Sequence, residues 1–128
     1  MFRLLTCFLL FWLGSNADKY TNPIALRAPD PWMVYYDGYY YLVATTFTNE
    51  LGLRTASTLS GLKDATNTTV FTTDGTVITA PEIHLVDGIW YLLYGACAVG
   101  MNDRHCHRIH VAQSTSDGPM GPYTFLSI

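Results

Sequence analysis

The fold of this chain is decided by the stretch APDPWMVYYDGYYYLVATT at residues 28–46, which returns in altered form as APEIHLVDGIWYLLYGA at residues 80–96. Each copy begins with Ala, Pro and an acidic residue, continues through apolar residues to an Asp-Gly pair, and ends in an aromatic run. The two Asp-Gly pairs are 50 residues apart. A two-residue Asp-Gly turn between apolar runs is a strong β-hairpin signal, because both of its positions take positive φ. A period of this length is typical of propellers and solenoids, so the sequence predicts a repeated β module.

Short segments rich in Tyr, Val, Ile and Thr divide each copy into four expected strands. The expected strands are residues 32–36, 39–46, 52–57, 69–72, 83–86, 89–94, 109–114 and 123–126. No segment shows a sustained helical period, and only residues 59–65 could form a single turn. Four strands in up-and-down order make one propeller blade. We therefore expect an all-β fold with one blade at about 28–75 and a second at about 80–128.

Two blades do not close a ring, and a repeat array generally needs about three units to bury its core. We therefore expect residues 18–128 to be the N-terminal part of a larger propeller domain, truncated in this chain. The alternative is a sandwich or open β-sheet whose two hairpins resemble each other only in composition.

The first 17 residues are predicted to be a secretion signal. Arg3 supplies the positive start, residues 4–13 are almost wholly apolar, and residues 15–17 are small enough for cleavage. The apolar run is short for a bilayer span; an N-terminal anchor or a buried strand is the alternative. We expect a secreted, extracellular protein that begins near Asp18.

Charge limits the partners of this chain. Its net charge is −3, with 7 basic and 10 acidic residues and no run of one sign. Phosphate binding needs a clustered basic face, so nucleic acid is not an expected partner. Nothing in the sequence calls for a membrane partner or a cofactor.

Two further features agree with secretion. Cys97 and Cys106 remain after the signal is removed, and an even pair in an oxidising compartment favours a disulfide across the loop in which the second copy carries its extra residues. Asn67 begins a glycosylation sequon in a Thr-rich segment, as expected for an exposed loop. Alternation along a strand puts Cys106 on the face opposite its two flanking histidines, so no metal site is expected. The histidines of this region are His105, His107 and His110.

Each copy places one acid near its start, Asp30 in the first and Glu82 in the second. The innermost strand of every blade lines the channel of a propeller, so we expect both carboxylates to point to one pocket from adjacent blades. Pro29 and Pro31 stiffen the chain around Asp30, which suits a carboxylate held in fixed geometry. Paired carboxylates facing each other across a pocket indicate hydrolysis of a glycosidic bond. The alternative for both acids is a structural carboxylate satisfied by hydrogen bonds.

These motifs together resemble glycoside hydrolase family 43, and most closely its fungal α-L-arabinofuranosidases. The resemblance spans residues 22–125 and depends on the ordered strings RAPDPW at 27–32, DGYYYL at 37–42, APEIH at 80–84, DGIWY at 87–91, AQS at 112–114 and GPMGP at 118–122. It implies a five-bladed β-propeller and an inverting mechanism with three acids. These are a base Asp in the first blade, an Asp in the third blade that tunes the proton donor, and a donor Glu further on. Only the base maps onto this chain, at Asp30.

The resemblance assigns Glu82 to the substrate pocket rather than to proton donation. Two departures from the family pattern affect the site. Thr79 stands where the family usually has Trp before Ala-Pro, which could weaken stacking on a sugar. Pro29 is an additional proline before Asp30, which could shift the base.

Three further residues are expected to bind substrate, namely Trp32, His84 and Arg54. Trp32 is close enough in sequence to Asp30 to form a platform for a sugar ring. His84 and Arg54 could contact sugar hydroxyls. Arg54 could equally pair with a carboxylate between blades.

We therefore predict that the parent protein hydrolyses O-glycosidic bonds in arabinose- or xylose-containing plant cell-wall polysaccharide or oligosaccharide. This chain alone should be inactive because it lacks the general acid. One alternative is a non-catalytic carbohydrate-binding propeller, which Thr79 favours. Another is a small structural protein that pairs its blades by oligomerisation.

Overall fold

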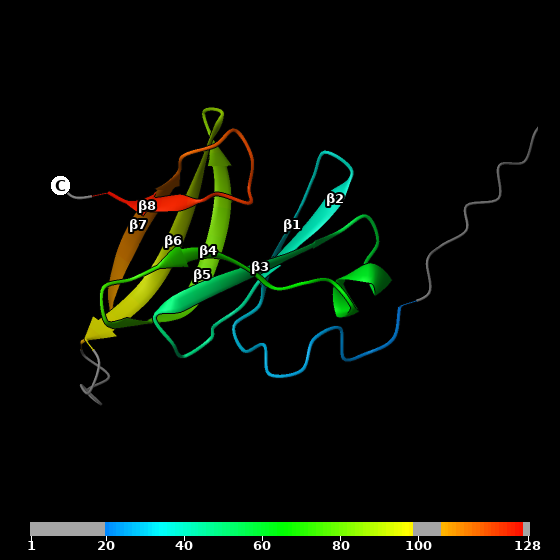
Figure 1. The fold of residues 1–128 in the computed structure, drawn as a ribbon, viewed down its shortest axis with the longest axis horizontal. Coiled ribbons are helices and arrows are strands. Elements are labelled where there is room, and N and C mark those ends of the chain that lie inside the picture. The colour runs from blue at the N-terminus through cyan, green and yellow to red at the C-terminus, as the bar shows by residue number, and fades with distance from the viewer. Residues whose placement is uncertain (1–19, 99–105, 127–128) are drawn as a thin grey trace, which may run out of the picture.

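A computed structural model describes residues 20–98 and 106–126 and contains two four-stranded antiparallel sheets (Figure 1). The first sheet, blade 1, consists of β1 (Trp32–Tyr36), β2 (Tyr39–Val43), β3 (Glu50–Ala56) and β4 (Thr68–Thr72). The second sheet, blade 2, consists of β5 (Thr76–Val86), β6 (Ile89–Ala98), β7 (Arg108–Ser114) and β8 (Tyr123–Phe125). A short 3-10 helix, η1 (Ser60–Lys63), joins β3 to β4. The strands follow chain order in both sheets, so the predicted all-β fold of two up-and-down blades is confirmed.

Both predicted Asp-Gly hairpins are present, and they join β1 to β2 and β5 to β6. The four turn residues all have positive φ, which is 47° at Asp37, 83° at Gly38, 51° at Asp87 and 81° at Gly88. Positive φ at both central positions defines a type I′ turn, whose twist matches that of the flanking strands. These turns fix the register of each hairpin, and with it the face on which every side chain of the first two strands lies.

β5 begins at Thr76, well before the expected start at residue 83. A proline cannot donate a hydrogen bond to a sheet and normally interrupts the ladder of a strand. The strand instead continues through a β-bulge between Thr79 and Glu82, where Ala80 has a φ of 43°. Because a bulge leaves residues outside the regular ladder, it accommodates Pro81.

The hydrophobic core lies between the two blades and takes residues from both. Aromatic pairs cross the interface: the rings of Tyr36 and Trp90 meet edge to face at 5.1 Å, and those of Phe71 and Tyr94 lie 5.2 Å apart. Such pairs add to the free energy of burying the rings. Trp90, Phe71 and Tyr94 belong to the core, and its remaining members are Tyr41, Val43, Leu51, Leu53, Val70, Ile78, Ile83, Leu92, Ala96, Ala112 and Tyr123.

The predicted disulfide is confirmed. Cys97, near the end of β6, is bonded to Cys106, just before β7, with the two Cα atoms 5.4 Å apart. Residues 99–105 of that loop and the predicted signal at residues 1–17 lie outside the described residues. Within the described ranges, no helix has the length and apolar character needed to cross a membrane.

Candidate functional site

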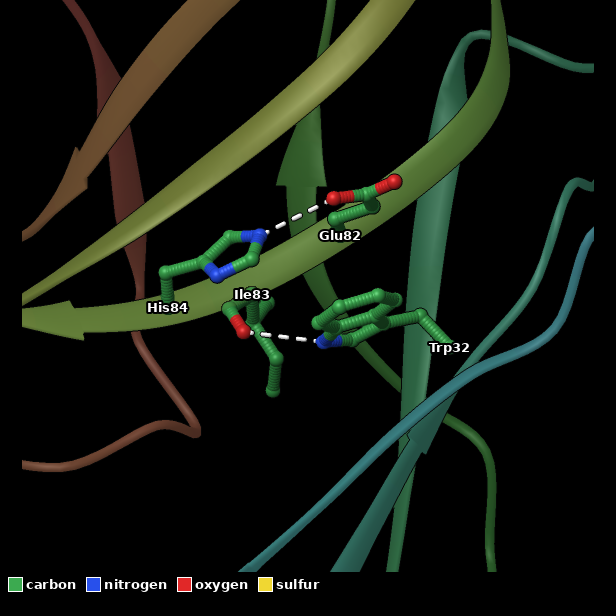
Figure 2. A network of polar contacts seen from close by, with 4 residues as sticks. All are labelled: Trp32, Glu82, Ile83 and His84. Carbon is green, nitrogen blue, oxygen red and sulfur yellow. Dashed lines mark hydrogen bonds and ion pairs between the residues drawn. The ribbon is translucent and has the colours of Figure 1, made fainter.

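The first strands of the two blades, β1 and β5, contact each other and form the edges of their sheets (Figures 1 and 2). An edge strand has backbone groups without a ladder partner. Trp32 of β1 satisfies one of them, because its Nε1 donates a hydrogen bond of 2.9 Å to the carbonyl oxygen of Ile83 on β5. The indole thus fastens blade 1 to blade 2 at the start of β1.

Glu82 and His84 lie two residues apart on β5 and project from the same face of the strand (Figure 2). Nε2 of His84 is 3.0 Å from Oε2 of Glu82, and the two side chains are 34% and 45% exposed. The His84 ring also packs against the indole of Trp32, with ring centroids 4.8 Å apart and planes tilted by 45°. Three of the residues predicted to bind substrate therefore form one half-exposed cluster. Its carboxylate, imidazole and indole can offer hydrogen bonds and a flat surface to a sugar.

Asp30 precedes β1, is exposed, and has a φ of 49°. Its Oδ2 accepts a hydrogen bond of 2.8 Å from Oγ1 of Thr45. No described residue donates a hydrogen bond to the other carboxylate oxygen, Oδ1. A water molecule can therefore bind to one oxygen while the other holds the side chain in place.

The two acids do not occupy corresponding positions in their blades. Counted back from the two Asp-Gly turns, Glu82 corresponds to Trp32, and Asp30 corresponds to Ala80. The backbone supports this correspondence, since φ is 49° at Asp30 and 43° at Ala80. The matching Ala-Pro-acid strings therefore stand at different distances from their turns, since Asp30 is farther from Asp37 than Glu82 is from Asp87. Glu82 thus projects from within its strand, whereas Asp30 lies ahead of its own.

The side chain of Arg54 makes its hydrogen bonds within blade 1. It lies on β3, the third strand of the sheet, and its Nη1 is 3.4 Å from the carbonyl oxygens of both Leu62 and Lys63 in η1. In the described part of the chain it makes no ion pair with a carboxylate and no hydrogen bond to the Glu82–His84 pair. These contacts support a role in holding η1 against blade 1.

One group of potential metal ligands is present among the described residues, formed by Cys97, Cys106 and His107, whose ligand atoms lie within 4.8 Å of one another. Both sulfur atoms belong to the disulfide, and a cysteine binds metal as a thiolate. His110 lies elsewhere, stacked on Tyr94 with centroids 5.5 Å apart, and His105 is outside the described residues. The disulfide therefore explains why the two cysteines of this group lie close together.

Asn67 is exposed immediately before β4, as a glycosylation site requires. Its carboxamide lies over Gly52 of β3, in the space that a Cβ at that glycine would occupy. Attachment of a glycan to Asn67 stays a prediction.

Sequence reasoning missed Thr45. Its side chain is 2% exposed, and its Oγ1 contacts both Asp30 and the backbone nitrogen of Ala80, at 2.8 and 2.7 Å. These partners are 15 and 35 residues away along the chain. No local pattern marks a threonine for such a contact, because it arises only when the ends of two strands meet.

A repeated four-stranded blade, with an acid ahead of the first strand of blade 1 and an aromatic cluster where the two blades meet, defines a β-propeller with a candidate carbohydrate site. Residues 20–127 match the profile of the Glycosyl hydrolases family 43. The chain belongs to this family.

Two curated relatives and one crystal structure are similar to this chain. The extracellular exo-α-(1→5)-L-arabinofuranosidase of Streptomyces avermitilis is 38% identical over 114 residues, and α-L-arabinofuranosidase 43 of Humicola insolens is 32% identical over 114 residues. Each alignment covers 84% of this chain and 23% of the relative. The crystal structure of α-L-arabinofuranosidase from Lactobacillus brevis matches with a TM-score of 0.75 at 29% identity, covering 84% of this chain and 38% of that one. The chain thus spans less than a quarter of the length of the curated relatives.

Proposed function

We propose that this chain supplies two blades of a secreted glycosidase that hydrolyses arabinose- or xylose-containing plant polysaccharide, with Asp30 as the general base. The proposal depends on one observation above all, the placement of Asp30. It is an exposed carboxylate ahead of the first strand of blade 1, with one oxygen held by Thr45 and the other available to water. The two similar arabinofuranosidases support arabinose as the sugar to test first.

In this mechanism Asp30 accepts a proton from a water molecule while the oxygen of that water attacks the anomeric carbon. A second carboxyl group, in its protonated form, donates its proton to the leaving oxygen as the glycosidic bond breaks. Attack from the side opposite the leaving group inverts the configuration of the anomeric carbon. Carboxyl groups that act in this way are roughly 6.5–9.5 Å apart, which leaves room for the water.

Glu82, His84 and Trp32 are proposed to line the substrate pocket. Glu82 and His84 project side by side from β5, and both are partly exposed. We do not assign Glu82 as the proton donor, because the resemblance places its motif in the substrate pocket. The donor is expected in a part of the enzyme beyond these two blades. The blades alone are therefore expected to be inactive, since general acid catalysis contributes about 10²–10⁴-fold.

Secretion is part of the same proposal. The apolar start of the chain, the sequon at Asn67 and the disulfide between Cys97 and Cys106 all suit a protein exported to an oxidising compartment. One of the similar arabinofuranosidases is named as extracellular. We propose that the protein meets its polysaccharide outside the cell.

A second candidate is a carbohydrate-binding propeller without hydrolytic activity. Thr79 favours it, because its hydroxyl donates to the carbonyl oxygen of Gly95 at 3.2 Å and offers no aromatic surface to a sugar. Arabinan binding without product release by the full-length protein would support this candidate.

The test is hydrolysis of 4-nitrophenyl α-L-arabinofuranoside and of the matching β-xyloside by full-length protein. Asp30→Asn should lower kcat by about 10²–10⁴-fold, because an amide cannot accept the proton from water. Asp37→Asn is the matched control: it makes the same chemical change in an exposed type I′ turn that also accepts Asn-Gly, and kcat should not change. Undiminished hydrolysis by Asp30→Asn would refute the assignment of the base.

A further inference from the structure

We propose that Thr45 is a positioning residue for the reaction, and that its hydroxyl group aims the carboxylate of Asp30 by anchoring it to the start of blade 2. This inference rests on the proposed function, because it assigns a partner to the proposed base. Neither the sequence pattern nor the resemblance singles out Thr45.

The chemistry of the three groups fixes the direction of both hydrogen bonds to Oγ1 of Thr45. The backbone N–H of Ala80 can only donate, so at 2.7 Å Oγ1 must be the acceptor. The hydroxyl hydrogen is then free to be donated to the second partner, Oδ2 of Asp30, at 2.8 Å. An ionised carboxylate only accepts, so the arrangement is complete when Asp30 carries its charge, as a general base must.

The hydroxyl is itself held in place. Thr45 is 2% exposed, and its backbone N–H donates to the carbonyl oxygen of Pro29 at 2.9 Å. The backbone and side chain of one residue therefore bind both Pro29 and Asp30, just ahead of β1. A β-branched side chain has few rotamers, which limits the movement of the hydroxyl. Asp30 is exposed, so without this bond its carboxylate would sample several orientations in solvent.

The contact also joins two unusual backbone conformations. Asp30 and Ala80 occupy corresponding positions ahead of the two Asp-Gly turns, and both have positive φ, at 49° and 43°. Non-glycine residues adopt this region at an energetic cost, and such residues cluster where the surrounding structure requires them. Here the positive φ brings the carboxylate of one blade and the N–H of the next to the same hydroxyl. The orientation of the base therefore depends on the packing of blade 1 against blade 2.

The first experiment compares Thr45→Val with Thr45→Ser in full-length protein, using 4-nitrophenyl α-L-arabinofuranoside. Valine keeps the shape of threonine but neither donates nor accepts. It should lower kcat about 10- to 100-fold, the change expected for loss of one hydrogen bond to a charged group. KM should change less than about 2-fold, because Thr45 does not contact the sugar in this mechanism. Serine keeps the hydroxyl and should restore most of kcat relative to valine.

Thr46→Val is the matched control, since the Thr46 hydroxyl donates to the carbonyl oxygen of Glu50 at 2.7 Å and does not contact Asp30. Its kcat should equal that of the parent. In the Asp30→Asn background, Thr45→Val should cause little further loss, because the carboxylate that the hydroxyl positions is already gone.

The outcomes separate this inference from the proposed function. Parental kcat in Thr45→Val, together with an inactive Asp30→Asn, would overturn the inference and leave the proposed function intact. An active Asp30→Asn would refute the assignment of Asp30 as the general base in the proposed function, and the positioning role of Thr45 with it. Circular dichroism checks folding, and Thr45→Ala, which leaves room for a water beside the N–H of Ala80, replaces the valine variant if that does not fold. If both variants unfold, or if KM rises while kcat is unchanged, the positioning role is refuted in favour of a structural one.

Discussion

Replacement of Trp32 by phenylalanine tests whether the indole fastens the two blades. The change keeps an aromatic ring near His84 but removes the Nε1 donor, so the carbonyl oxygen of Ile83 loses its partner. Ile83 is 1% exposed, which limits the access of water to that oxygen. Leaving a buried acceptor unpaired costs about 1–3 kcal/mol of unfolding free energy. We expect Trp32→Phe to destabilise the protein by this amount.

Trp90 of β6 provides the matched control. It is 1% exposed, and within the described part of the chain its Nε1 has no hydrogen-bond partner. Phenylalanine at this position would empty on the order of 40 Å³, which costs roughly 1 kcal/mol. The same change removes a buried N–H donor that has no partner, and the unfolding free energy gained in this way is about as large as that lost to the cavity. We therefore expect Trp90→Phe to change the unfolding free energy by less than about 1 kcal/mol.

The assay is urea unfolding of the full-length variants followed by circular dichroism, because each variant loses a fluorophore. The dependence of the free energy on urea concentration should be the same in all variants. Burial alone predicts that the fully buried Trp90 is the more sensitive position, whereas the hydrogen bond predicts that Trp32 is. A larger loss in Trp90→Phe than in Trp32→Phe would refute the reasoning.

Three further predictions concern stability. A variant with both Cys97→Ala and Cys106→Ala should lose about 2.5 kcal/mol of unfolding free energy, because the disulfide closes a loop across a sequence separation of 9. A reductant should lower the stability of the parent by a similar amount and leave the variant unchanged; an equal effect on both would contradict this. Burial raises the pKa of Tyr123, whose hydroxyl donates to the carbonyl oxygen of Pro119 at 2.7 Å. The unfolded chain loses this phenolic proton first, near pH 10, so the stabilisation is complete below about pH 10 and is lost as the pH rises towards the higher pKa of the folded state. In Tyr123→Phe the urea midpoint should therefore fall less between neutral pH and about pH 11 than in the parent, and an identical fall would count against this role. Gly121→Ala should destabilise more than Gly38→Ala in thermal unfolding. Both glycines have positive φ, of 66° and 83°, but only at Gly121 would the added Cβ lie 2.7 Å from the ring of Tyr123. Equal losses of stability in the two variants would show that backbone strain at positive φ, and not the clash with Tyr123, determines the effect of Gly121→Ala.

Several features of this protein follow from short stretches of chain. The Asp-Gly turns, the eight strands and η1 were all expected from local patterns, and their observed ends differ from the expected ones mainly at β5. The expected start of β5 was wrong, because a bulge lets the strand continue through Pro81, where a proline would normally interrupt the ladder. The disulfide was also predictable, since only two cysteines follow the predicted signal.

The candidate site was predictable only in part. Asp30, Trp32, Glu82 and His84 were all singled out, and the structure brings the last three into one cluster. The two acids do not take corresponding places in their blades. Repeated letters align the Ala-Pro-acid strings, but hydrogen-bonded register is what determines which residues correspond, and it is shifted by two.

By itself the sequence determined the class of fold, the turns, the covalent link and the family, because each depends on residues close together in the chain or on their order. Only the tertiary structure decided what surrounds Asp30. Thr45, Ala80 and the carbonyl of Ile83 are ordinary groups in isolation, and they acquire their roles because two separately formed sheets pack with β1 against β5. Such contacts depend on packing between residues distant in sequence, which no local preference encodes.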